Sequence, residues 1–267
     1  MNASDKMFLP DVQSHTDSRN LAIQRVGIKD LTTPVQIETA DGRIQSSVAK
    51  VDMFVALPAE LKGTHMSRFI EVLQHNEQAL SVTRMQSLMQ ETLTRLEAQE
   101  GMIEFRLPFF VKKTAPVSGV ESLMDYQLSL RAECLKADIR VIQKLVVPVT
   151  SLCPCSKKIS AYGAHNQRSH ITISAELSAP LAPERLINTA EKCASSEVYG
   201  ILKRPDEKFV TEQAYDNPKF VEDLVRDVAL AVKALPEVVA AQIEAENFEA
   251  IHNHSAYALI EFDKRHP

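Results

Sequence analysis

The sequence predicts an α+β protein in which two successive units each run strand, strand, helix, helix, strand, strand, with antiparallel sheets. Two observations lead to this prediction. Stretches of alternating apolar and polar residues, typical of half-buried strands, flank stretches with apolar residues at helical spacing. The same order of six elements then recurs in the second half of the chain. We place the two units at residues 23–136 and 137–267, after a flexible arm of residues 1–22.

The first unit is predicted from alternation, from one turn and from two helix caps. Asp41 and Gly42 form a pair typical of hairpin turns. Thr64 and Ser81 are suited to cap two helices, in which apolar residues recur every three or four positions. These apolar positions are Met66, Phe69, Ile70 and Leu73 in the first helix, and Met85, Leu88, Met89, Leu93 and Leu96 in the second. The extended segments are 35–38, 47–57, 102–112 and 123–134.

The second unit repeats this order with different residues. A helix is expected over 183–193, and Asn217 and Pro218 are suited to the N-cap and first position of a long helix that reaches residue 235. Residues 203–212 are dense in charge, so we expect a solvated loop there. The extended segments are 139–150, 168–177, 238–246 and 255–262.

The composition excludes several classes of protein. The net charge of -5 argues against binding nucleic acid through bulk electrostatics. No apolar run approaches the roughly 20 residues that cross a bilayer, and residues 1–20 lack the apolar core of a signal peptide, so we expect a cytoplasmic protein without membrane contact. Four cysteines do not make a disulfide framework, and with seven glycines there is no glycine-rich phosphate loop.

A pair of thiols and two imidazoles lie close together in the sequence. Cys153 and Cys155 follow a predicted strand, and His165 and His170 come soon after. A Cys-x-Cys spacing is tight for a structural zinc finger, whereas a catalytic zinc needs only three protein ligands and an open position. Packing or surface-reactive cysteines, and hydrogen-bonded structural histidines, remain the alternatives to a metal site.

Further downstream, three acidic or histidine segments suit a metal or a nucleotide. Glu207 can supply a hard oxygen ligand, while the neighbouring Arg204 can hold a phosphate. Glu222 falls in the first turns of a predicted helix, where the helix dipole alone favours a carboxylate, although it also suits the paired N–H donors of a planar base. Glu249 and His252 precede the last predicted strand.

Several of these motifs together resemble GTP cyclohydrolase of type IB. The resemblance runs from about residue 26 to residue 257, and that family has the tunnelling fold, whose unit is ββααββ and which places two units in each chain. The motifs are Lys62-Gly-Thr-His-Met-Ser-Arg-Phe69, Ser151-Leu-Cys-Pro-Cys-Ser156, Gly163-Ala-His-Asn-Gln-Arg-Ser-His170, Lys203-Arg-Pro-Asp-Glu207 and Asn247-Phe-Glu-Ala-Ile-His-Asn-His-Ser-Ala-Tyr257.

The resemblance implies an enzyme that hydrolyses GTP at C8 of the guanine. Formate leaves, and the ribose rearranges to give 7,8-dihydroneopterin triphosphate, the first step toward tetrahydrofolate. The family implies one divalent metal per site, as zinc, manganese or iron, and a homotetramer whose modules form a barrel with active sites at the subunit interfaces.

Site residues are implied by the same motifs. Cys153, Glu207 and His252 are expected to bind the metal, with His165 beside it as a ligand or proton shuttle. Cys155 and Glu249 are expected to belong to the catalytic network, and Glu222 to anchor guanine. Charge alone suggests the contacts to the triphosphate, which are Lys113, Arg68, Arg204 and His65.

Two other functions remain open at this point. A nitrile reductase of the same fold would use a Cys thioimide and NADPH. A zinc-stabilised scaffold without catalysis would unfold on chelation and consume no GTP.

Overall fold

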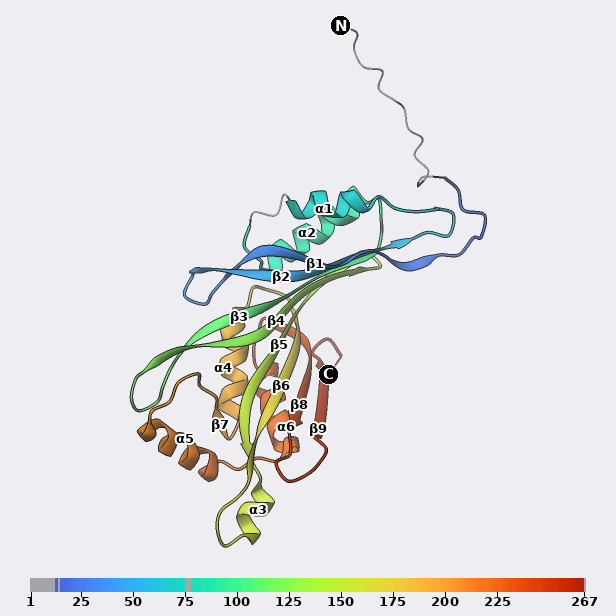
Figure 1. Cartoon of the computed structure of the whole chain (residues 1–267). Coiled ribbons are helices and arrows are strands. Elements are labelled where there is room, and N and C mark those ends of the chain that lie inside the picture. Colours follow the sequence, from blue (N-terminus) through green and yellow to red (C-terminus); the bar gives the residue numbers. More distant parts are fainter. Residues whose placement is uncertain (1–12, 14, 75–77, 267) are drawn as a thin grey trace.

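The chain forms one antiparallel sheet with helices packed on it (Figure 1). We describe a computed structural model that covers residue 13, residues 15–74 and residues 78–266. The strands are β1 Ile23–Glu38, β2 Ile44–Leu57, β3 Gly101–Thr114, β4 Glu121–Leu135, β5 Asp138–Leu152, β6 Asn166–Leu177, β7 Ser196–Glu197, β8 Val238–Asn247 and β9 Ala256–Asp263. The helices are α1 Met66–Gln74, α2 Val82–Arg95, α3 Pro154–Ile159, α4 Pro183–Cys193, α5 Arg204–Asp216 and α6 Val221–Lys233.

Strand order in the sheet follows chain order. The path is β1-β2-β3-β4-β5-β6-β8-β9, with the short β7 paired to β5. All of these pairs are antiparallel, and the helices lie in the connections from β2 to β3 and from β6 to β8, with α3 between β5 and β6. The α+β class with an antiparallel sheet is therefore confirmed.

A two-residue turn joins the two halves of the sheet. Leu135 pairs with Asp138, so only Lys136 and Ala137 lie between β4 and β5. Both have positive φ, at 51° and 64°, which matches the twist of a tight hairpin although neither residue is glycine. The ladder is therefore continuous from one half of the chain to the other.

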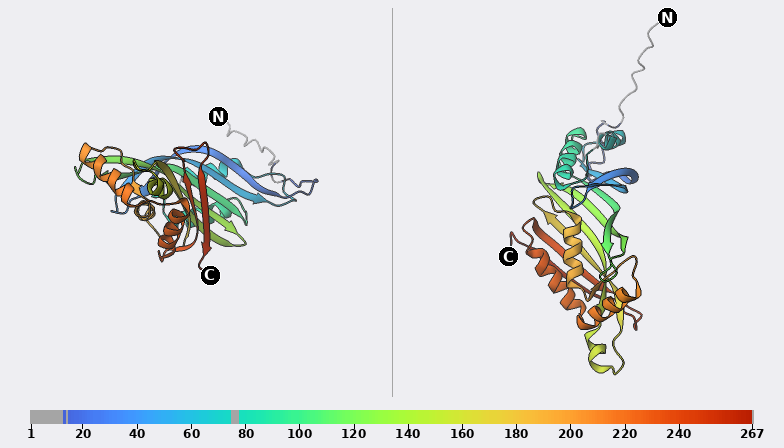
Figure 2. Two further views of the ribbon diagram at one scale, coloured as in Figure 1. Left: turned by 90° about the horizontal axis from the view of Figure 1, so that it is seen from below. Right: turned by 90° about the vertical axis from the view of Figure 1, so that its left-hand side faces the viewer.

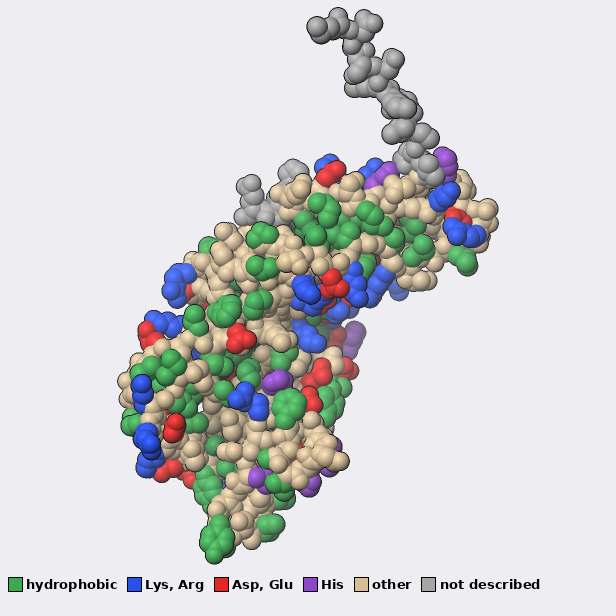
Figure 3. All heavy atoms as spheres, viewed as in Figure 1, with side chains coloured by type: hydrophobic (Ala, Val, Ile, Leu, Met, Phe, Trp, Pro, Cys, Tyr) green, Lys and Arg blue, Asp and Glu red, His purple; other side chains and the backbone are tan. Residues whose placement is uncertain are grey.

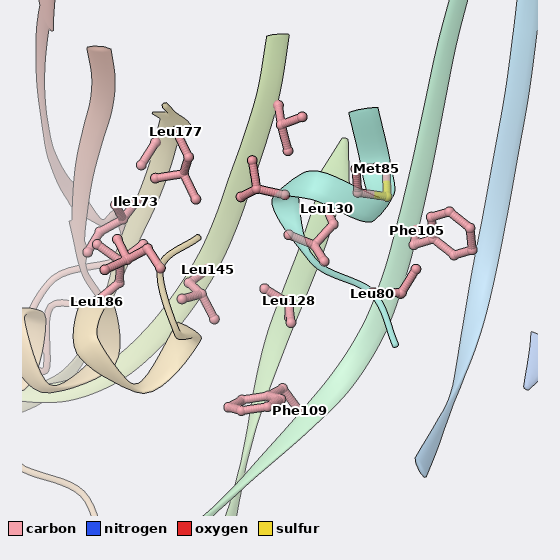
Figure 4. Close-up of a cluster of buried hydrophobic side chains, with 14 of the residues drawn as sticks. Leu80, Met85, Phe105, Phe109, Leu128, Leu130, Leu145, Ile173, Leu177 and Leu186 are labelled. Atoms are coloured by element: carbon pink, nitrogen blue, oxygen red, sulfur yellow. The ribbon is translucent and has the colours of Figure 1, made fainter. Parts of the chain in front are cut away.

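The core lies between the sheet and its helices, which cover one face in both halves (Figure 2). Alternate residues of β5 are buried, and β5 contacts both α2 and α4, so one apolar layer spans the join. In Figure 4, Met85 lies beside Leu130. The same view shows Leu145 between α2 and Leu186 of α4. Burying one leucine side chain contributes roughly 1.5–3 kcal/mol to the free energy of unfolding, so this apolar layer stabilises the sheet and helices that the connecting segments join.

Several boundaries differ from the sequence prediction. The first strand begins at Ile23 rather than residue 35, because two register shifts against β2 interrupt its alternation. Of the predicted arm, residues 1–12 and 14 lie outside the described residues, while Asp17 N–H donates to Glu60 O at 2.9 Å. Residues 203–212 were expected to be a loop, but Lys203 is the N-cap of α5 and residues 204–212 belong to that helix. Asn217 ends α5, and α6 begins at Val221.

Candidate functional site

One end of the second half brings together the α3 turn, the start of β6 and the loop after β8 (Figure 1). The Cys153 N–H donates to the His165 carbonyl at 3.1 Å, which closes the loop that carries α3. The Phe248 N–H donates to the Arg168 carbonyl at 3.0 Å, which brings the segment 249–254 to the same end. Histidine side chains also gather at this end of the surface (Figure 3). The two sequence segments richest in sulfur and imidazole are thus neighbours.

Cys153 is held at the first turn of α3. Pro154 follows it directly, and because proline cannot donate to a ladder, the strand stops and a short helix begins. The half-buried Cys153 accepts a hydrogen bond at Sγ from the Ser156 N–H at 3.5 Å. Cys155 is exposed on the same turn. The two thiols therefore have different surroundings: the Cys153 sulfur is fixed by the backbone and the Cys155 sulfur faces solvent.

His165 is oriented by two hydrogen bonds. Its backbone N–H donates to Ser156 Oγ at 3.3 Å, and its ring Nδ1 lies 3.0 Å from Gln167 Oε1. Because an amide oxygen only accepts, Nδ1 carries a hydrogen in this arrangement, so the neutral imidazole has its lone pair on Nε2. This side chain can therefore bind a metal or accept a proton through Nε2.

A buried polar cluster supports these residues, and no pattern in the sequence predicts it. Asn247 Oδ1 accepts hydrogen bonds from Ser151 Oγ at 3.1 Å and from Ser169 Oγ at 2.8 Å. The two hydroxyls also contact each other, and all three side chains are buried. The cluster ties the ends of β5, β6 and β8 together immediately next to Cys153 and Phe248. Its members continue the buried faces of their strands, two positions from Val149, Ile171 and Ala245, so only their tertiary contacts reveal them.

The loop after β8 carries the predicted Glu249 and His252. Glu249 is half-buried, while the exposed His252 stacks on His254 with ring centroids 5.2 Å apart. His170 packs edge-on against Phe248 at 4.9 Å, and its burial lowers its pKa. His170 is therefore best explained as a neutral packing residue, whereas His252 is accessible to a ligand.

Glu207 lies apart from this group within one chain. It is exposed on the first turns of α5, whereas the last turn of α5 contacts α3 through the Lys157 ammonium, which lies 4.2 Å from the Tyr215 ring centroid. Glu207 and Tyr215 are eight positions apart in the helix, or roughly 12 Å along its axis. Glu207 and Tyr215 therefore lie near opposite ends of α5, and the Tyr215 end is the one beside α3.

The predicted donor set fits a divalent metal chemically, because thiolate, imidazole and carboxylate are common ligands of zinc and of manganese or iron. The geometry of one chain does not complete it. Within residues 13, 15–74 and 78–266, no three His, Cys, Asp or Glu side chains converge closely enough to hold an ion. Cys153 and His165 are brought to one place, and Glu207 is not.

Glu222 stands on the first turn of α6, near the Cys153 turn. The Lys219 N–H donates to the Leu152 carbonyl at 3.1 Å, so the approach to α6 runs beside the residue that precedes Cys153. Glu222 is exposed, and its carboxylate has no hydrogen bond or ion pair with the described residues. A carboxylate in this state is available to a ligand.

Sequence comparison decides the family. Residues 9–258 match the family described as type I GTP cyclohydrolase FolE2. The chain belongs to this family. It is 58% identical over 267 residues, all of this chain and 99% of the relative, to a protein of Burkholderia ambifaria (strain MC40-6) named GTP cyclohydrolase FolE2. A protein of the same name from Burkholderia multivorans is 57% identical over the same length. The resemblance inferred from the motifs is confirmed.

Among solved structures, uricase from Arthrobacter globiformis is a fold neighbour of this FolE2-family chain. The TM-score is 0.51 at 8% sequence identity, with 90% of this chain and 92% of that chain covered. At this identity the likeness concerns the fold alone. It places the chain beside a tunnelling-fold-like protein, in agreement with the predicted α+β class.

The cations predicted to contact a triphosphate are spread over this FolE2-family chain. Arg68 of α1 lies in the first half, where its guanidinium donates to the Arg95 carbonyl at 3.1 Å and lies 3.3 Å from Glu97. His65 is half-buried just before α1. Arg204 is exposed at the start of α5. These three assignments stay predictions.

Lys113 has an unexpected environment. It is 7% exposed, and its ammonium lies 2.7 Å from Glu191 and 2.6 Å from Glu197. The Tyr126 hydroxyl donates to the same Glu191 carboxylate at 2.7 Å. Burial raises the pKa of Glu191, and the adjacent Lys113 opposes that rise. In one chain Lys113 is thus an internal ion-pair partner, and its predicted contact with a triphosphate requires these carboxylates to release it.

Proposed function

We propose that this chain hydrolyses GTP at C8 of guanine, releases formate and forms 7,8-dihydroneopterin triphosphate, the first step of tetrahydrofolate biosynthesis. The observation that carries the proposal is the family match over residues 9–258, within which Cys153 and His165 are brought together at one end of the sheet. The chain is a GTP cyclohydrolase by family, and its alternatives find less support. A nitrile reductase or a scaffold would not account for relatives at 58% identity that are named GTP cyclohydrolase.

We assign the metal to Cys153, Glu207 and His252, with His165 adjacent. A bound divalent ion would supply Lewis acidity and lower the pKa of a water molecule near C8. The chain contributes orientation: the Ser156 N–H fixes the Cys153 sulfur, and Gln167 fixes the ring of His165. Through the Nε2 of its neutral ring, His165 is suited to accept and return protons during ring opening and the sugar rearrangement.

Glu222 is proposed to accept paired N–H donors from the guanine edge. A charge-assisted pair of this kind positions the base so that C8 faces the metal-binding residues, which converts binding energy into orientation. Glu249 and Cys155 complete the catalytic network at the α3 end. Lys113, Arg68, Arg204 and His65 are the candidates for holding the triphosphate away from the reacting bond.

The proposed assembly is a homotetramer in which two ββααββ modules per chain contribute to a barrel, in the cytoplasm. Two features of one chain support sites at subunit interfaces. Glu207 lies on the first turns of α5, whereas Cys153 lies beside α3, which contacts the last turn of α5. In addition, β1 and β9 are the two outer strands of the sheet. A neighbouring copy of the chain can supply the metal ligand that lies too far away within one chain.

The activity is tested on protein purified without oxygen and stripped of metal. GTP is added with zinc, manganese or iron in parallel, and formate is measured together with the fluorescent pterin formed after oxidation. We expect both products in at least one reaction and neither without metal. No product with any of the three metals would refute the proposal, and NADPH consumption with a nitrile substrate would favour the reductase.

A further inference from the structure

The tip of the β3–β4 hairpin is bound to the start of α5 through one carboxylate. Asp206 is fully buried, and it accepts four hydrogen bonds. Three come from the hairpin tip: the Val117 and Ser118 N–H groups donate to Oδ1, each at 2.8 Å, and the Ser118 hydroxyl donates to Oδ2 at 2.6 Å. The fourth comes from the Lys203 N–H, which donates to Oδ2 at 2.8 Å. Each oxygen of Asp206 is therefore used twice.

The hairpin tip is shaped to present these donors. The Ala115 N–H donates to the Val120 carbonyl at 2.9 Å, and the Gly119 N–H donates to the Ala115 carbonyl at 3.2 Å. Gly119 has a φ of +70°, which a side chain disfavours, and its conformation lets the tip close. The N–H groups of Val117 and Ser118 then point at the start of α5 rather than along the ladder.

Contacts of β3 and β4 beside the tip also hold the hairpin in place. Lys113 of β3 forms the buried ion pairs with Glu191 of α4 and Glu197 of β7. At Gly200, a Cβ would come within 3.0 Å of the Leu123 carbonyl oxygen, so the segment that leads to α5 runs directly against β4. Both the hairpin and the approach to α5 are thus held against the sheet.

Asp206 and Glu207 are adjacent but face different surroundings. Successive helical residues point about 100° apart, so a carboxylate at 206 that faces the hairpin leaves the next one turned away from it. Glu207 is exposed, and its carboxylate makes no hydrogen bond or ion pair with the described residues. Asp206 therefore binds the hairpin tip, and Glu207 faces outward.

We propose that Asp206 is a positioning residue, which locks the first turn of α5 onto the β3–β4 hairpin tip and thereby fixes the direction of the Glu207 carboxylate. The proposal rests on the proposed function, in which Glu207 binds the metal. It adds that the metal site depends on a contact between the first and second halves of the same chain, through residues that touch neither metal nor GTP.

The test compares metal affinity across five single variants of the full-length protein. Asp206→Ala removes all four acceptor contacts, Asp206→Asn keeps the shape but replaces one oxygen with a donor, and Ser118→Ala removes one contact from the hairpin side. Asp216→Asn changes an exposed acid on the same helix and is the matched control. Glu207→Ala removes the proposed ligand itself. Metal affinity is measured by competition with a chromophoric chelator, and hydrogen exchange is followed at residues 115–119 and 204–207.

We expect Asp206→Ala to weaken metal binding by at least about tenfold, Asp206→Asn and Ser118→Ala to weaken it less, and Asp216→Asn to bind as the parent does. Hydrogen exchange at the hairpin tip should rise in step, while the elution volume and far-UV spectrum stay unchanged. If Asp206→Ala does not fold, the ordering of Asp206→Asn, Ser118→Ala and the control decides.

The outcomes separate this proposal from the proposed function. Loss of metal in Glu207→Ala with parental affinity in all Asp206 and Ser118 variants overturns the positioning role and leaves the metal assignment intact. Parental affinity in Glu207→Ala overturns the assignment of the ligand, and the positioning role with it.

Discussion

The two halves of the chain share an order of elements and differ in their connections. Residues 23–135 run β1, β2, α1, α2, β3, β4, and the second half runs β5, β6, α4, α6, β8, β9. The second half adds α3 between its first two strands, and β7 with α5 between its two helices. Cys153 and Glu207 lie on these additions. The comparison teaches that the repeated frame forms the sheet and its core, while the added connections carry two of the proposed metal ligands.

Arg106 and its acids in the first half also contrast with two acids of the second half. In the first half, Arg106 lies 2.7 Å from Asp52, 3.0 Å from Asp30 and 3.0 Å from Glu104, so its acids are neutralised locally. In the second half, Glu207 and Glu222 have no such partner among the described residues. A carboxylate that the fold leaves unpaired is suited to a ligand, and a carboxylate that the fold pairs contributes to stability.

The largest effect should come from the added turn. Cys153→Ala removes the proposed thiolate ligand, so we expect loss of both metal retention and turnover. Cys193→Ala, on α4 of the repeated frame, should keep both, because burial raises the pKa of that thiol and disfavours a thiolate. Bound metal measured by elemental analysis, alongside formate release, checks this. Loss of activity in both variants would point to a structural effect and would break the comparison.

A smaller effect is expected at the start of α6. Glu222→Ala should weaken GTP binding by on the order of 100-fold, since charge-assisted hydrogen bonds contribute about 1.5–3 kcal/mol each, and should leave metal content unchanged. Calorimetric titration of metal-free protein with GTP measures it. Glu212→Gln, an exposed surface acid on α5, is the control. Normal GTP affinity in Glu222→Ala would rule out the role as base anchor.

The smallest effect concerns the paired acids of the first half. Hydrogen bonds from Arg106 and from the Asp30 N–H lower the pKa of Asp52. The ionised Asp52 therefore stabilises the folded state above the ordinary aspartate pKa near 4, and this stabilisation is lost as the pH falls below that value. We expect Asp52→Asn to cost about 1 kcal/mol at pH 7, allowing for solvent around the half-exposed Arg106, and to cost progressively less at lower pH. Turnover should not change.

Urea midpoints at pH 7 and pH 3 measure this difference. Asp125→Asn, at an exposed position on β4, is the control. A stability cost that is equal at both values of pH would contradict the ion-pair explanation. A loss of turnover in Asp52→Asn would instead indicate that the first half also takes part in the reaction.

Much of the frame was predictable because local patterns and tertiary packing agree. The helix predicted at 183–193 has these bounds, and the alternation of Ile103, Phe105 and Leu107 marks the buried face of β3. The error at α5 has a physical cause. Only Asp206 and Ala214 of this helix are buried, so it lacks an apolar stripe and depends on contacts that its own sequence does not reveal.

The site was predictable in part for the same reason. Cys153 and His165 are joined by one short loop, so their proximity follows from local sequence. The partners of Lys113, by contrast, are Glu191 and Glu197, some 80 residues away, and spacing carries no information about such contacts. Charge alone suggested an open cation where the fold forms a buried ion pair.

The turn at Lys136 and Ala137 has a consequence for motion. Many enzymes close two domains over a substrate by bending at a flexible linker. Here the two halves share a hydrogen-bonded ladder that runs from Leu135 and Asp138 to Gln127 and Val146, so there is no linker to bend. A movement around GTP would therefore fall to the connections, such as residues 248–254 and the α3 turn, and not to a bend between the halves. The frame itself would stay still through each turnover.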